Sequence, residues 1–182
     1  MAAGCSFSSA PPDDVDFAAV TDLHQLDGRY RNRGQGAPGD APLLLSALVF
    51  PTDTALAHAA IEVLEVRATS PDTLTVRAIG AQGVVVTEGT FVAGRDFTLD
   101  EGRVRIGHRW APLSYSPEHA PDDPLVGPRT ETVELGIDRR GQGKYRSSFT
   151  GAGLVYLIVP IAFHQAREVR FERIEPQPPP AR

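Results

Sequence analysis

Apolar and polar residues alternate with a period of two along most of the chain after residue 60. This period is typical of a β-strand with one face toward the core and the other toward water. Turn residues separate the alternating runs, for example at residues 70–72 and 80–83. The pattern therefore predicts an all-β protein, built as an antiparallel meander of about eight or nine strands.

The phase of the alternation predicts which side chains point toward the core. In the run RVRIGHRW, at residues 103–110, every second residue from Val104 onward is bulky or aromatic, and the residues between them are Arg or Gly. The runs ETVELGID and REVRFERI show the same phase relation. We expect eight side chains to point inward: Val104, Ile106, Trp110, Val133, Leu135, Ile137, Val169 and Phe171.

Other element signals are few. Residues 41–50 and the segment that begins at Asp53 predict short helices, around 43–48 and 53–59. The longest apolar run, at 152–163, contains Pro160 and is shorter than the roughly 20 residues that a membrane-spanning helix needs, so it predicts a buried strand. The Pro-rich end at 176–182 predicts an extended, polyproline-like tail.

Length, composition and charge limit the class of protein to which this chain can belong. A length of 182 residues with 41% hydrophobic residues is enough for one domain with a core of its own, which we place at residues 21–175. The net charge is −5 and the 18 basic residues are scattered. The basic residues form no continuous stripe that could follow a phosphate backbone, so we do not expect nucleic acid as a partner. The single cysteine excludes an internal disulfide.

That cysteine, Cys5, follows the small residues of AAGC and precedes a Ser-, Pro- and Asp-rich stretch. The tetrapeptide resembles the end of a lipobox, in which bacterial lipoproteins carry an acylated cysteine. The resemblance implies lipidation at Cys5, a signal sequence ahead of the residues given, and a flexible tether over residues 6–20. With Ser6 next to the cysteine, it also implies anchoring in the outer membrane of the bacterial cell envelope, facing the periplasm. A chance small-residue start in a disordered terminus is the alternative.

A second resemblance lies in LDGRYRNRG, at residues 26–34. Gly28-Arg29-Tyr30 followed by a meander is similar to the first strand of a lipocalin-like barrel, and the same start resembles small proteobacterial lipoproteins. The resemblance implies a closed barrel, with Arg170 or Arg173 as a late arginine. A β-sandwich is the alternative fold, because strand number and alternation fit both. An interior that accepts a small apolar ligand would be lined by aromatic residues, for which the candidates are Tyr30, Trp110, Tyr145, Phe149 and Tyr156.

The sequence supports an enzymatic function less well than it supports ligand binding. A metal site would draw on His108, His119 and a carboxylate of the 114–128 loop, which contains Glu118, Asp122 and Asp123. No ligand pair there has the spacing typical of zinc sites. We therefore predict neither a metal nor another cofactor, and keep a metal-dependent enzyme as the alternative.

Three further groups of residues have the side chains or backbone that catalysis or phosphate binding would need, but each lacks the rest of the motif. Ser147 and Ser148 lack a nucleophile-elbow motif, the turn carboxylates are expected in solvent, and the Gly-rich loop at 31–40 lacks the lysine of a P-loop. The turn carboxylates are Asp96, Asp100 and Glu101. We predict no catalytic residue. The expected function is a lipid-anchored module that binds a small apolar ligand or an envelope protein.

Overall fold

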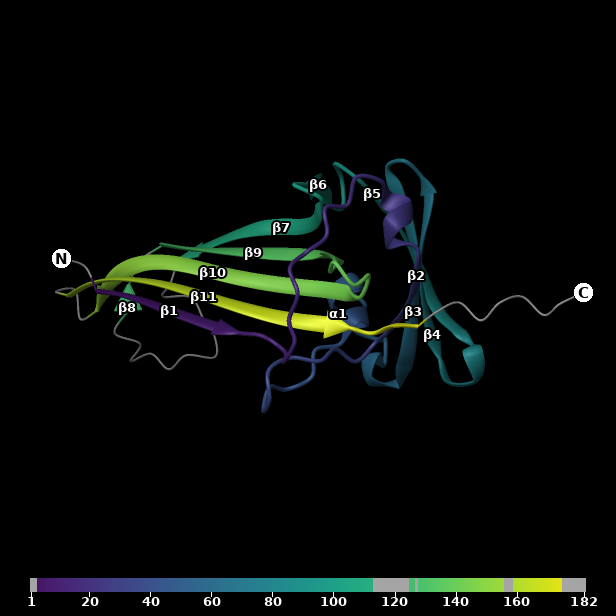
Figure 1. Ribbon diagram of the computed structural model, residues 1–182, viewed down its shortest axis with the longest axis horizontal. Coiled ribbons are helices and arrows are strands. Elements are labelled where there is room, and N and C mark those ends of the chain that lie inside the picture. Colours follow the sequence, from purple (N-terminus) through teal and green to yellow (C-terminus); the bar gives the residue numbers. More distant parts are fainter. Residues whose placement is uncertain (1–2, 113–124, 127, 156–158, 175–182) are drawn as a thin grey trace, which may run out of the picture.

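The computed structural model describes residues 3–112, 125–126, 128–155 and 159–174 (Figure 1). Its strands form two sheets, which we call the long sheet and the short sheet. The long sheet has the order β1-β11-β10-β9-β7-β6, with β8 pairing to β10. Its strands are β1 (Ala3–Ser9), β6 (Thr98–Asp100), β7 (Arg103–Pro112), β8 (Leu125–Val126), β9 (Pro128–Ile137), β10 (Gly143–Val155) and β11 (Val159–Phe171).

The short sheet has the order β12-β2-β3-β4-β5. Its strands run across those of the long sheet, so the two sheets form crossing layers, and the long sheet extends beyond the short one toward the N-terminus (Figure 1). Crossing of this kind is one of the two common ways in which sheets pack. The strands are β2 (Gly28–Arg31), β3 (Ile61–Ser70), β4 (Thr73–Gly80), β5 (Val85–Val92) and β12 (Arg173–Ile174).

The prediction of an all-β, largely antiparallel meander is confirmed, but the described residues form twelve strands rather than the eight or nine expected. From β2 onward most neighbouring strands pair antiparallel in chain order, and only β1 is parallel to its neighbour. The described strands do not close into a single ring, so the lipocalin-like barrel is not seen in them. Glu172 alone separates β11 of the long sheet from β12 of the short sheet, which means that one stretch of chain joins the two layers.

The core lies where the sheets cross. Four of the side chains expected to point inward are buried, namely Val104, Ile137, Val169 and Phe171. Val133 and Leu135 are partly buried and pack against the core. These six outcomes confirm the strand phase.

Ile106 also faces the space between the sheets, as predicted, but 38% of its surface is exposed. A β-bulge between Arg105 and Gly107 interrupts the pairing of β7 with β9. A bulge inserts one extra residue and so breaks the period of two. The side chain of Trp110 lies outside the described residues.

The N-terminal segment differs from the flexible tether that we expected over residues 6–20. Residues Ala3–Ser9 form β1, which pairs parallel with β11. Phe17 and Val20 are buried, and the Phe17 ring lies 5.1 to 5.4 Å from the cationic groups of Arg103, Lys144 and Arg146. Two apolar anchors and an edge strand therefore hold this segment on the domain.

The apolar run at 152–163 is not one buried strand. It is divided between β10 and β11, which are antiparallel, with Val155 opposite Val159. Ala152 and Ala162 are exposed. Two adjacent strand ends share the run, and a linear pattern does not distinguish this arrangement from a single strand.

Helices are short, as the sequence predicted. The expected helix at 43–48 is α1 (Leu45–Val49), and part of the second expected helix overlaps the 3₁₀ turn η2 (His58–Ala60). Two further 3₁₀ turns are η1 (Leu23–Leu26) and η3 (Ala81–Gly83). No helix in the described ranges is long and apolar enough to cross a membrane. The tail at 176–182 and most of the 114–128 loop lie outside the described residues.

Candidate functional site

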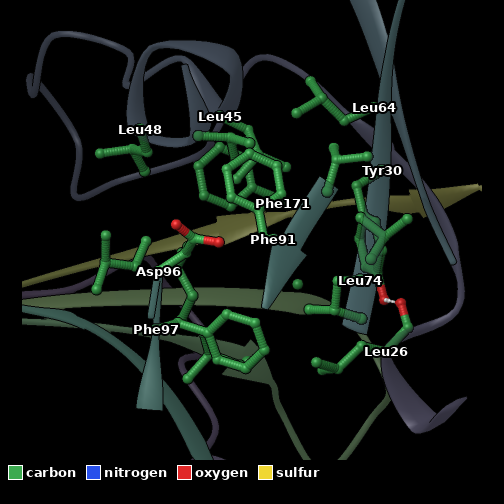
Figure 2. Close-up of a pocket in the computed structure, with 18 of the residues that line it drawn as sticks. Leu26, Tyr30, Leu45, Leu48, Leu64, Leu74, Phe91, Asp96, Phe97 and Phe171 are labelled. Atoms are coloured by element: carbon green, nitrogen blue, oxygen red, sulfur yellow. Dashed lines mark hydrogen bonds between the residues drawn. The ribbon is translucent and has the colours of Figure 1, made fainter. Parts of the chain in front are cut away.

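A cavity of about 340 Å³ lies between the two sheets, beside α1 (Figure 2). The short sheet contributes Tyr30, Leu64, Val66, Leu74 and Val76 to its wall, and the long sheet contributes Val104, Leu135 and Phe171. Helix α1 adds Leu45, Leu48 and Val49. The volume falls within the range of ordinary small-molecule sites, which are also mostly apolar.

The cavity has an accessible side. Pro51 and Thr52 line it just after α1, and both are exposed. Ile106 on β7 also lines the cavity while 38% of its surface is exposed. The bulge next to Ile106 thus places an apolar side chain at the rim rather than in the closed core.

A buried asparagine fixes the helix that forms one wall. Asn32, 1% exposed, donates hydrogen bonds from Nδ2 to the carbonyl oxygens of His58 (2.8 Å) and Ile61 (2.9 Å). Its Oδ1 accepts a hydrogen bond of 2.8 Å from the backbone N–H of Ser46, inside α1. A helix of five residues is not stable by itself, so this amide, which satisfies three buried backbone groups, holds α1 over the cavity.

Tyr30 lies at the base of the wall formed by the short sheet. Its hydroxyl donates a hydrogen bond of 2.8 Å to the carbonyl oxygen of Leu26 (Figure 2). Burial raises the pKa of Tyr30 above its ordinary value, so the phenol stays neutral at physiological pH. It presents an apolar ring to the cavity, because its polar end is already bonded.

Arg173 covers the Tyr30 ring at 5.7 Å from the centroid. The arginine also donates a hydrogen bond to the carbonyl oxygen of Asp27. A Cβ atom at Gly28 would lie 2.6 Å from its Nε, so a side chain at this position would require the arginine side chain to shift. Of the two late arginines that the sequence offered, Arg173 makes this contact, while Arg170 donates a hydrogen bond to Gln35 instead.

Asp96 is the only carboxylate among the described residues that line the cavity. Its side chain is 30% exposed and pairs with Arg95 at 2.7 Å. Figure 2 shows the carboxylate directed between Leu48 and Phe97. Hydrogen bonds from Arg95 and from the backbone N–H of Val92 hold the pKa of Asp96 below its ordinary value, so the group is ionised at neutral pH.

The aromatic candidates from the sequence are separated by the fold. Tyr30 lines the cavity, whereas Tyr145 is buried in the core and is not among the lining residues. Phe149 lies farther along β10 and is partly buried. Tyr156 and the side chain of Trp110 lie outside the described residues. Of the three candidates whose side chains the structure describes, Tyr30 alone lines the cavity.

The polar candidates do not come together in the described part of the chain. Asp100 and Glu101 pair with Arg105, and Ser147 and Ser148 are partly buried positions on β10. No group of three His, Cys, Asp or Glu residues is arranged to hold a metal ion among the residues described. His119, Glu118, Asp122, Asp123 and the side chains of His108 and Cys5 lie outside them.

Several lining residues were missed by sequence reasoning. Leu45, Leu48 and Val49 have the spacing of one helix face, which was available as a signal. Phe91, Phe97 and Asp96 come from the end of β5 and the turn after it, and no local pattern links them to α1. The chain matches no family model, no curated protein and no solved structure.

Proposed function

We propose that this protein is a binding module that takes a small apolar ligand into the cavity between its sheets. The observation that carries the proposal is the cavity itself: about 340 Å³, apolar walls, and exposed residues at the rim. Well-packed interiors contain few voids larger than a water molecule. A space of this size between two otherwise packed layers is therefore explained better by a ligand than by chance packing.

The fold supports the same proposal. We propose that the two crossing layers form an orthogonal sandwich whose open side leads to the cavity. The contact of Arg173 with Tyr30 joins β12 and β2, which are neighbours in the short sheet and are its last and first strands along the chain. The lipocalin resemblance implies a late arginine of this kind. The contact supports a relationship to lipocalin-like binding proteins without requiring a closed barrel.

The cavity can be tested by filling it. Val66 lines the cavity from β3 and is partly buried, so we expect Val66→Phe to occupy the space a ligand needs. The neutral fluorescent probe N-phenyl-1-naphthylamine should bind to the wild-type protein, and its affinity for the Val66→Phe variant should fall at least tenfold.

Val85 provides the matched control for this substitution. It lies on β5 of the same sheet, is 51% exposed and does not line the cavity. Val85→Phe should bind the probe as the wild type does. Equal probe binding by Val66→Phe and wild type, with both proteins folded by circular dichroism, would show that the probe binds elsewhere.

We further propose that the domain is a lipoprotein, acylated at Cys5 and anchored to the bacterial outer membrane with the domain facing the periplasm. The support is the AAGC sequence, to which the fold adds a geometric consideration. Cys5 lies on edge strand β1, at the end of the long sheet that extends away from the short sheet (Figure 1). An anchor at this position would leave the cavity on the part of the domain that is farther from the membrane.

The anchor has a direct test. Expression of the natural precursor in cells fed an alkyne-labelled fatty acid should label the protein, and Cys5→Ser should abolish the label. Two acyl signals are needed for stable attachment, so the labelled protein should also remain in the membrane fraction after a high-salt wash. Labelling that persists in Cys5→Ser would place the modification on another residue.

A further inference from the structure

The charges around the cavity point to the kind of ligand that fits. Two ionisable side chains other than Tyr30 line it in the described part of the chain, Asp96 and Lys144. The Nζ of Lys144 is bound by the carboxylate of Asp14 at 2.7 and 2.9 Å and by the carbonyl oxygen of Val15 at 2.7 Å. The ammonium group of Lys144 is therefore already paired with the N-terminal segment. Asp96 remains as the charged group available to a ligand.

The carboxylate of Asp96 keeps room for another donor. Its Oδ2 accepts hydrogen bonds from the backbone N–H of Val92 (2.8 Å) and from Arg95 Nη2 (2.7 Å). Arg95 Nε donates to both oxygens, at 3.0 Å to Oδ2 and 3.1 Å to Oδ1. Among the described residues Oδ1 therefore accepts only this shared bond, and since a carboxylate oxygen can accept two hydrogen bonds, it can take a further donor.

A ligand in the cavity would contact Asp96 and not its partner Arg95. Its side chain is 67% exposed and it is not among the residues that line the cavity. Exposed ion pairs are screened by water, so Arg95 only partly neutralises the carboxylate. Phe91 and Phe97 also line the cavity, and aromatic rings favour a neighbouring cation.

The volume limits the apolar part of the ligand. About 340 Å³ corresponds to roughly eleven groups of the size of a water molecule, at ~30 Å³ each. A methylene group is of similar size, so a saturated chain of about ten carbon atoms would fill the space. Longer chains would extend past Pro51 and Thr52 into solvent.

We propose that the cavity takes a cationic amphiphile: an apolar chain or ring system of about ten carbon atoms with one ammonium-type head group bound to Asp96. This rests on the proposed ligand-binding function and specifies the ligand class for the same cavity. The ammonium group would donate to Oδ1 of Asp96, and the apolar part would lie between α1 and the two sheets.

The test compares three ligands that share a ten-carbon chain and differ in the head group. Decylamine, 1-decanol and decanoate are titrated at pH 7, below their micelle concentrations, against the protein loaded with N-phenyl-1-naphthylamine. We expect decylamine to displace the probe at a concentration roughly fivefold lower than 1-decanol, the size of a partly exposed ion pair, and decanoate to be the weakest.

Asp96→Asn should remove the advantage of decylamine over 1-decanol, because the amide can still accept from Val92 but carries no charge. Asp16→Asn is the matched control, since Asp16 is 72% exposed and pairs with Arg139 outside the cavity; it should leave the order of the three ligands unchanged. Equal displacement by all three ligands, or strongest displacement by decanoate, would overturn the cationic assignment and leave the apolar cavity intact. Failure of the wild type to bind the probe at all would instead overturn the proposed function.

Discussion

Replacing Phe171 with alanine is expected to lower the free energy of unfolding by about 3–5 kcal/mol. Phe171 is 1% exposed and lies on β11, close to the point where the chain passes from the long sheet to the short sheet. Truncation removes the apolar area of the ring and leaves a void next to an existing cavity. A Cβ atom at Gly143 would lie 3.1 Å from the Cβ of Phe171, so neighbouring backbone already packs tightly there.

Denaturation in urea, followed by circular dichroism, measures this change. Phe7→Ala is the control, since Phe7 is 64% exposed and should change stability by less than about 0.5 kcal/mol. If Phe171→Ala does not fold, Phe171→Leu retains part of the volume and should show a smaller loss of the same sign. Phe171→Ala as stable as wild type would mean that β11 has the opposite phase.

A loss of similar size is expected from Lys144→Met. Lys144 is 2% exposed, and its Nζ pairs with Asp14 and with Glu168, whose side chain is 10% exposed. Methionine keeps the length of the side chain but leaves Asp14 without its cation and Glu168 with Arg146 as its remaining partner. Removing one partner of a buried ion pair costs about 3–5 kcal/mol, since the remaining charge is buried without compensation.

Two variants separate the charge effect from a packing effect. Lys144→Met combined with Asp14→Asn removes the carboxylate that has lost its cation, so part of the lost stability should return. Arg31→Met breaks the Arg31–Glu172 pair, whose side chains are 57% and 53% exposed, and should cost less than about 1 kcal/mol. Equal losses in the two single variants, measured by the same urea titration, would mean that Lys144 is not buried with its partners.

Strand phase could be predicted wherever alternation continues without interruption. Val169 and Phe171 are examples, because a strand with one buried face repeats every two residues. Ile106 lines the cavity, as the alternation predicts, but its 38% exposure beside a bulge was not predicted. A bulge depends on how two strands pair, so the sequence of β7 alone gives no sign of the extra residue.

The structure of the N-terminal segment and the position of the cavity were harder to predict from the sequence, for a different reason. Composition identified residues 6–20 as a tether because Ser, Pro and Asp dominate it, yet Phe17 and Val20 are enough to hold it on the sheet. An average over a segment conceals two anchoring residues. The cavity joins α1, both sheets and the turn at Asp96, and such contacts between distant elements leave no periodic trace in the sequence.

The pairing of the first strand with the last long strand has a consequence for how the chain acquires its structure. Ala3 lies opposite Ile161, and Arg29 lies opposite Ile174. During synthesis β1 and β2 leave the ribosome well before their partners β11 and β12. Neither sheet can be completed until those partners have been made, and contacts so distant in sequence slow folding. A chain that stays unfolded for that interval is available to a chaperone, or to a translocation channel that accepts only unfolded polypeptides.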